Sequence, residues 1–130
     1  EQKSAWMGSY GIGITRVMGV IAEKFSDEKG LIWPENIAPA KIYLVQIGEK
    51  SQELAEEIYN EFSKKGIEVL FDDRNLRPGQ KFADAELMGI PYRLTISDRL
   101  LESGKFEVVT RANGEVELLS REELFEKFVK

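Results

Sequence analysis

The sequence predicts an α/β domain in which three helices cover a five-stranded mixed sheet, in the order βαβαβββα. Two apolar runs at 42–47 and 67–71 flank a segment with the apolar spacing of a helix, which is typical of parallel strands joined by a crossover. Further along, Asn113-Gly114 divides two apolar runs, which is typical of an antiparallel hairpin. Both kinds of strand pairing are therefore expected in one sheet.

Composition narrows the kinds of site that the chain can hold. Its 130 residues fit one domain with a short extension. Cysteine and histidine are both absent, which excludes disulfides and thiolate metal sites, and we expect no metal site. The net charge of −5 argues mildly against a partner held only by bulk positive potential, but leaves a local nucleic-acid contact open. With no membrane-spanning run and no signal segment, we expect a cytoplasmic protein without a membrane partner.

The first forty residues predict an extended piece, a helix and a linker. An apolar segment at 17–22 follows three glycines and is interpreted as the helix. Within 26–40, Pro34 and Pro39 forbid a regular helix or a central strand. We therefore predict a domain boundary near residue 38.

The first strand of the sheet is predicted at 42–47, where nearly continuous apolar character indicates burial on both faces. Gly48 ends this strand, and Ser51 can cap the helix that follows. Gly66 is the expected end of that helix, before the strand at 67–71. The helix carries an apolar stripe that faces the sheet: Leu54, Ala55, Ile58, Tyr59 and Phe62.

A second helix and a third strand follow. Pro78 suits the first turn of the helix, and Gly89 with Pro91 terminates it. Residues 92–97 alternate between apolar and polar side chains, which predicts a half-buried strand.

The last part of the chain predicts a hairpin and a closing helix. Strands at 106–111 and 115–119 flank a type I′ turn at Asn113-Gly114. Ser120 and Glu123 have the spacing of a capping box, which marks the start of the last helix.

The loop after the second strand is rich in charge, at an edge of the sheet where open α/β folds bind ligands. Asp72-Asp73 suggests a metal site, but neighbouring strand residues point to opposite faces, so one carboxylate at most could face a given site. We favour the interpretation that one aspartate caps the loop or pairs with Arg74 or Arg77.

Phe82 and Glu86 are four residues apart, so they share one face of the second helix, and Arg93 begins the next strand. One interpretation is a structural ion pair between Glu86 and Arg93. The other is a base-reading site, because a carboxylate accepts from guanine N1–H and N2–H while an arginine donates to O6 and N7. An aromatic ring adds a stacking face, as in the recognition of unstacked RNA bases. Both interpretations stay open from the residues alone.

The glycines near the start, in the pattern Gly8-x-x-Gly11-x-Gly13, do not have the spacing of a dinucleotide fingerprint. Close packing of a helix on a sheet explains these glycines as well as a ligand-binding role does. Arg16 is an isolated charge on an apolar segment, and it either reaches solvent or stacks on a planar ligand.

Taken together, these motifs resemble the C-terminal part of the prolyl-tRNA synthetase family, one of the class II aminoacyl-tRNA synthetases. Residues 8–16 resemble the third signature motif of the class, 30–39 the connection to the anticodon-binding domain, and 72–91 the centre of that domain. The resemblance covers nearly the whole chain. It divides the chain into three parts: 1–25, the tail of the catalytic core; 26–38, a linker; and 39–130, the anticodon-binding domain.

The resemblance implies that the domain binds the anticodon stem-loop of proline tRNA and reads its two guanines. It places Phe82, Glu86 and Arg93 at base-reading positions. It also places three basic residues near phosphates, as a weaker inference: Arg74, Arg77 and Lys81. Some relatives carry a lysine in the turn after Arg111, whereas this chain has Asn113-Gly114-Glu115, so we assign no base contact there.

For the whole enzyme, the resemblance implies activation of proline with ATP and Mg²⁺ and its transfer to tRNA. It also implies that this domain is joined to the rest of the synthetase chain and that the enzyme is a homodimer. It assigns four residues to the ATP and amino-acid site of that enzyme: Ser9, Gly11, Gly13 and Arg16. Two earlier signature motifs of the class are absent from these residues. We therefore expect no catalytic residue here and no activity from this chain alone.

Two further hypotheses remain. The chain could be an interaction domain or accessory subunit that keeps the fold without reading RNA. It could also be a small doubly wound domain that binds a ligand beside Gly48, but no phosphate-loop residues follow 42–47, and we rank this last.

Overall fold

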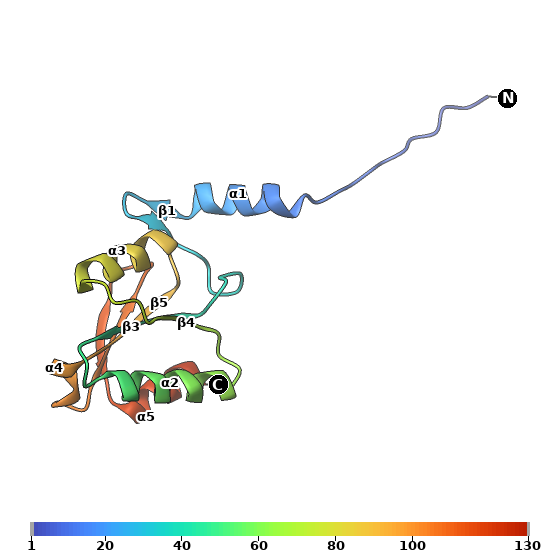
Figure 1. Cartoon of the computed structure of the whole chain (residues 1–130). Helices are drawn as coiled ribbons and strands as arrows, with labels where there is room; N and C mark the ends of the chain where they lie inside the picture. Colours follow the sequence, from blue (N-terminus) through green and yellow to red (C-terminus); the bar gives the residue numbers. More distant parts are fainter. Residues whose placement is uncertain (1, 130) are drawn as a thin grey trace.

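The computed structural model describes residues 2–129 and shows a sheet with helices on both faces (Figure 1). The strand order is β4-β3-β5-β6-β7. β3 pairs in parallel with β4 and β5, whereas β6 pairs antiparallel with β5 and β7. The predicted mixed sheet is therefore confirmed. Its strands are β3 (Ile42–Ile47), β4 (Val69–Asp72), β5 (Tyr92–Ser97), β6 (Phe106–Thr110) and β7 (Val116–Leu119).

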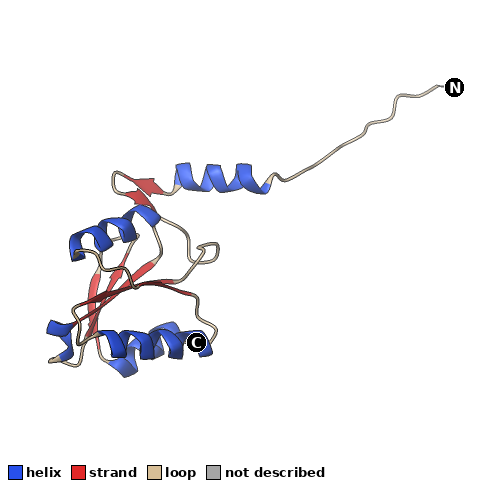
Figure 2. Cartoon of the chain, viewed as in Figure 1, coloured by secondary structure: helices blue, strands red, loops and turns tan. Residues whose placement is uncertain are grey.

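The helices form two layers, which Figure 2 shows in blue on either side of the sheet. α2 (Gln52–Lys64) and α5 (Arg121–Phe128) cover one face, and α3 (Pro78–Met88) covers the other. These are the three helices that the sequence predicts. The helix predicted around 17–22 is also confirmed, as α1 (Ile14–Lys24), and the structure adds a short helix, α4 (Asp98–Leu101), directly after β5.

The main core lies between the sheet and the layer of α2 and α5. Phe62 is fully buried there, with its ring centroid 4.7 Å from that of Phe125 and 6.0 Å from that of Phe128. A smaller core lies under α3, where Ala85 and Ile90 pack on Tyr43 and Val45 of β3. α3 is thus held to the sheet by few apolar contacts, which leaves its polar side chains close to the strands.

β5 differs from the prediction of a half-buried strand. Three consecutive residues at its centre, Leu94, Thr95 and Ile96, are all buried. β5 lies between β3 and β6, so both of its faces are covered at this level. The alternating pattern identified the strand correctly but underestimated its burial.

Two predictions about turns and caps need correction. Ser51 lies at the start of α2, but its hydroxyl donates to the Ile47 carbonyl and does not cap the helix. The type I′ turn at Asn113-Gly114 is also wrong, because only Gly114 has a positive φ, of 70°. The Thr110 N–H donates to the Glu115 carbonyl, so a longer turn joins β6 to β7. By contrast, the capping box that opens α5 is confirmed.

Ahead of the sheet, the predicted linker contains a small hairpin, β1 (Ser26–Asp27) and β2 (Gly30–Leu31), that packs against α3. The Trp33 N–H donates to the Gly89 carbonyl at 3.0 Å.

α1 has no buried residue and projects away from the domain (Figure 1). Only Phe25 separates α1 from β1, and it donates to the Ile21 carbonyl while accepting from the Ile32 N–H. Among the helices of residues 2–129, none has the length and hydropathy that a membrane span requires.

Substitution of Gly89 tests how firmly the hairpin is held. Gly89 and Gly114 both have φ of 70°, so alanine at either position is strained by about 1–2 kcal/mol. A methyl group on Gly89 would also overlap the Leu31 backbone, whereas one on Gly114 meets no atom within 4 Å. We expect Gly89→Ala to lower the free energy of unfolding in urea more than Gly114→Ala does. Equal losses would contradict the close packing of the hairpin on α3.

Candidate nucleic-acid interface

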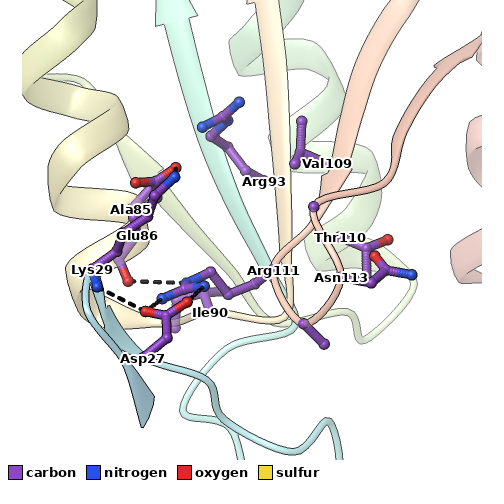
Figure 3. A pocket seen from close by; sticks show the side chains of 12 residues that line it. Asp27, Lys29, Ala85, Glu86, Ile90, Arg93, Val109, Thr110, Arg111 and Asn113 are labelled. Atoms are coloured by element: carbon purple, nitrogen blue, oxygen red, sulfur yellow. Dashed lines mark hydrogen bonds and ion pairs between the residues drawn. The ribbon is translucent and has the colours of Figure 1, made fainter.

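A pocket of about 310 Å³ opens between the C-terminal half of α3, the β1–β2 hairpin and the turn after β6 (Figure 3). The sheet supplies its floor through Arg93 of β5 and Val109 of β6, which are paired across the two strands and so point to the same face. α3 supplies Glu86 from the side. Two of the three residues predicted to read bases, Glu86 and Arg93, therefore line one pocket.

The guanidinium of Arg93 lies on the ring of Phe82, with its central carbon 4.3 Å from the ring centroid. Its nearest carboxylate oxygen belongs to Glu107, at 3.7 Å, which is too long for a hydrogen bond. The Arg93 Nε is buried and has no hydrogen-bond partner within residues 2–129. Stacking thus fixes the plane of this guanidinium, and Arg93 is one of the residues that line the pocket.

Glu86 faces the same pocket, with its side chain 34% exposed. Its carboxylate pairs with the ammonium of Lys29, at 3.2 Å between Nζ and Oε1. The predicted ion pair between Glu86 and Arg93 does not form, because each residue has a different partner among the described residues. The purely structural interpretation of these two side chains therefore loses its main support.

Arg111 lines the pocket on the side of the hairpin, a role that the sequence alone does not predict. It holds the Asp27 carboxylate through two hydrogen bonds of 2.7 and 2.6 Å, and its Nε donates to the Glu86 carbonyl at 3.1 Å. The guanidinium holds the pKa of Asp27 well below its usual value. One signal was available: the antiparallel pairing of the strands at 92–97 and 106–111 places Arg111 beside the end of the second helix.

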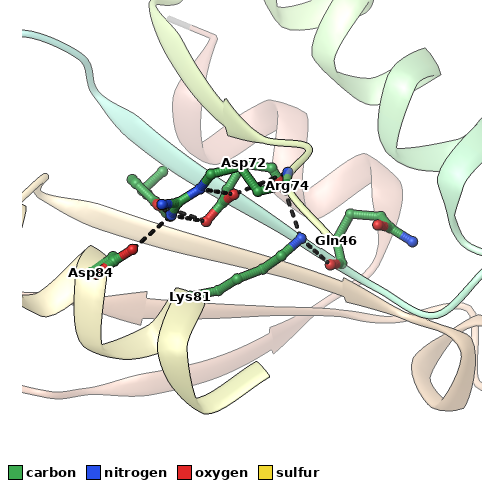
Figure 4. Close-up of polar contacts among 6 residues, drawn as sticks. Gln46, Asp72, Arg74, Lys81 and Asp84 are labelled. Atoms are coloured by element: carbon green, nitrogen blue, oxygen red, sulfur yellow. Dashed lines mark hydrogen bonds and ion pairs between the residues drawn. The ribbon is translucent and has the colours of Figure 1, made fainter. Parts of the chain in front are cut away.

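A second polar cluster lies under the N-terminal half of α3 (Figure 4). Arg74 donates to both oxygens of Asp72 at 2.8 Å, and the Tyr43 hydroxyl donates to the same carboxylate at 2.8 Å. The hydrogen bonds from Arg74 hold the pKa of Asp72 at about 2, below its usual 3.8. Burial, followed by the neighbouring Asp72, raises the pKa of Tyr43 to about 12. The predicted pairing of an aspartate with Arg74 is confirmed.

Lys81 belongs to this structural cluster. Its side chain is buried, and its ammonium donates to the carbonyls of Gln46 and Asp72 at 3.0 and 2.9 Å. These carbonyls stand at the ends of β3 and β4, so the lysine joins α3 to two strands. Among the three basic residues predicted near phosphates, Lys81 is occupied inside the protein, Arg74 is half-exposed, and Arg77 is exposed without an ion pair within residues 2–129.

Comparison with known proteins identifies the family of the chain. Residues 41–130 match the family described as the anticodon binding domain. The chain belongs to this family. It is also 46% identical over 127 residues to the proline–tRNA ligase of Persephonella marina, covering 95% of this chain and 22% of that protein.

Two other relatives show the same relation. The proline–tRNA ligase of Endomicrobium trichonymphae is 47% identical over 117 residues, which cover 88% of this chain and 21% of that protein. The one of Bacillus mycoides is 46% identical over 127 residues, which cover 95% of this chain and 22% of that protein. The chain therefore spans about a fifth of the length of these curated relatives.

The residues predicted for an ATP and amino-acid site lie outside the folded anticodon-binding domain. They occupy the segment before α1 and its first turn, and all are exposed: Ser9, Gly11, Gly13 and Arg16. Their roles stay predictions. Within residues 2–129, no group of three or more acidic side chains is placed to hold a metal ion.

Asp72→Asn tests the buried cluster. Because the folded-state pKa of about 2 lies below the usual value of 3.8, this carboxylate stabilises the fold fully above about pH 4 and less as the pH falls through 2. We expect the substitution to lower the free energy of unfolding by about 2 kcal/mol at pH 7 and to flatten its decline between pH 4 and 2. Asp73→Asn, at the exposed neighbouring position, is the matched control in urea denaturation. Equal behaviour of the two variants would refute the assignment.

Proposed function

We propose that this chain is the anticodon-binding domain of a proline–tRNA ligase and reads the two guanines of the proline anticodon. The observation that carries the proposal is that Glu86 and Arg93, whose guanidinium is stacked on Phe82, line the same pocket. The family match and the names of the relatives support the class of ligand.

The pocket offers both halves of the guanine pattern. The Glu86 carboxylate can accept from N1–H and N2–H, and the Arg93 guanidinium can donate to O6 and N7. Adenine has a donor at N6 where guanine has an acceptor at O6, so Arg93 would keep only N7 as an acceptor and Glu86 would lose both of its donors. A volume of about 310 Å³ is at the lower end of ordinary ligand pockets, which suits one base.

The role of Phe82 changes in detail. The sequence suggested a ring on which a base stacks, but one face of that ring is covered by the Arg93 guanidinium. In the proposed site Phe82 fixes the plane of Arg93, and the guanidinium offers the flat surface to the base. This arrangement reads a base without strong bulk charge, in keeping with a chain whose net charge is −5.

Contacts with the tRNA backbone are proposed for Arg77 and, more weakly, for Arg74. Arg77 precedes α3 and is exposed, and the Arg74 side chain is 47% exposed beyond its pairing with Asp72. The backbone contact predicted for Lys81 is not carried into the proposal, because its ammonium is bound to two carbonyls inside the protein.

The activity of the whole enzyme is proposed on the resemblance and on the relatives. The enzyme would activate proline with ATP and Mg²⁺ and transfer it to proline tRNA, as a homodimer in the cytoplasm. Ser9, Gly11, Gly13 and Arg16 would contribute to its ATP and amino-acid site. The anticodon-binding domain would supply recognition and no catalytic residue.

Removal of Arg93 tests base reading. We expect Arg93→Ala to weaken binding of a proline anticodon stem-loop by about 1–3 kcal/mol in fluorescence titrations, because O6 and N7 of a guanine lose their donors. Binding of a copy with both anticodon guanines replaced by adenine should change little. Arg99→Ala, on the exposed surface of α4, is the matched control.

The wild-type chain provides the first check of that experiment. Equal affinity of the wild type for the two loops would end the base-reading proposal and favour an interaction domain that keeps the fold. If thermal melting shows that Arg93→Ala unfolds the domain, the residue has a structural role instead.

Arg77→Ala tests the backbone contact separately. We expect it to weaken both loops alike and to reduce the slope of log K against log salt by about 1, because one phosphate contact is lost. The measurement is the titration of each loop across a range of salt concentrations. A loss confined to the guanine loop would contradict a phosphate contact.

A further inference from the structure

The pocket is completed by a segment that lies ahead of the part of the chain matched to the family. That match begins at residue 41, yet Asp27 and Lys29 of the β1–β2 hairpin line the pocket together with Glu86 (Figure 3). From the sequence, this segment is expected to be a linker. Its side chains instead contact the residue that is proposed to read the donor edge of guanine.

The hairpin is built so that Lys29 has a fixed position. One oxygen of Asp27 accepts from the backbone N–H groups of Lys29 and Gly30, at 2.9 and 3.1 Å, which shapes the turn between β1 and β2. The same carboxylate is held by Arg111, whose Nε donates to the backbone carbonyl of Glu86. One chain of hydrogen bonds therefore fixes the position of the Lys29 backbone and of the Glu86 backbone.

We propose that Lys29 is a positioning residue that orients the Glu86 carboxylate for guanine, an inference that rests on the proposed function. Its ammonium lies 3.2 Å from Oε1 of Glu86, at the rim of the pocket, where the lysine side chain is 64% exposed. Without this partner, a glutamate on the surface of α3 would sample several rotamers, and ordering it would weaken base binding.

The contact with Lys29 leaves the carboxylate able to bind a base. An ionised carboxylate has two oxygens with about four acceptor positions, and the ammonium takes one of them. Guanine N1–H and N2–H need one position on each oxygen. Lys29 and a guanine can therefore bind Glu86 at the same time, so the lysine does not have to leave when the base enters.

A double-mutant cycle on the whole chain separates positioning from other roles of the charge. The variants are Lys29→Met, Glu86→Ala and the double variant, with Lys29→Arg as the conservative replacement. Lys64→Met is the matched control, because Lys64 is exposed on α2, which covers the opposite face of the sheet. Each is titrated with the proline anticodon stem-loop and with the copy that carries adenine in place of both guanines, and thermal melting reports on the fold.

We expect Lys29→Met to weaken the guanine loop about two- to fivefold, the range of exposed ion pairs, and to leave the adenine loop unchanged. In the Glu86→Ala background it should have no further effect, and Lys29→Arg should restore binding. The loss should shrink as salt rises. Lys64→Met should change neither loop.

Equal weakening of both loops would overturn the inference, because Lys29 would then contact a phosphate. It would also be overturned by a loss that persists in the Glu86→Ala background, or by no loss at all. A wild-type chain that binds both loops equally would overturn the proposed function, and this inference with it. If the wild type prefers guanine and Lys29→Met keeps that preference in full, the inference alone fails.

Discussion

The parallel pairing of β3 with both of its neighbours is the constraint on which the candidate site depends. Parallel strands cannot be joined by a tight turn, so the chain that leaves β4 must cross β3 before it enters β5. α3 makes this crossing on the face opposite α2. Its path carries Phe82 and Glu86 to the strand that bears Arg93, and a different strand order would separate them.

Much of this architecture could be predicted from the sequence, because strand and helix patterns have different periods and glycines mark the ends of α2 and α3. The errors share a physical origin. Ser51 and Asn113 are typical cap and turn residues, but their bonds depend on groups that the chain brings near: the Ile47 carbonyl for the serine, and the Glu115 N–H for the asparagine. Local preference identifies such positions and leaves the partner undetermined.

The charged side chains of the site show the same limit. Arg77 and Lys81 are four residues apart near the start of α3, yet one is exposed and the other is bound to the ends of two strands. The resemblance to the family implied a common role near phosphates for both residues. The burial of each side chain decides which of the two can reach a phosphate. That burial follows from how α3 lies on β3. Asp27 and Lys29 were missed for a related reason, since prolines downstream made their segment look like a passive connection.

The single residue Phe25, which joins α1 to the β1–β2 hairpin, limits the directions that α1 can take. Its N–H bonds into α1 and its carbonyl accepts from the strand side, so one residue that is tied at both ends separates the helix from the hairpin. A flexible tether lets an attached module search a volume that grows with tether length. A joint of one residue leaves few free backbone angles, so α1 has a narrower range of directions relative to the hairpin than a flexible tether would allow.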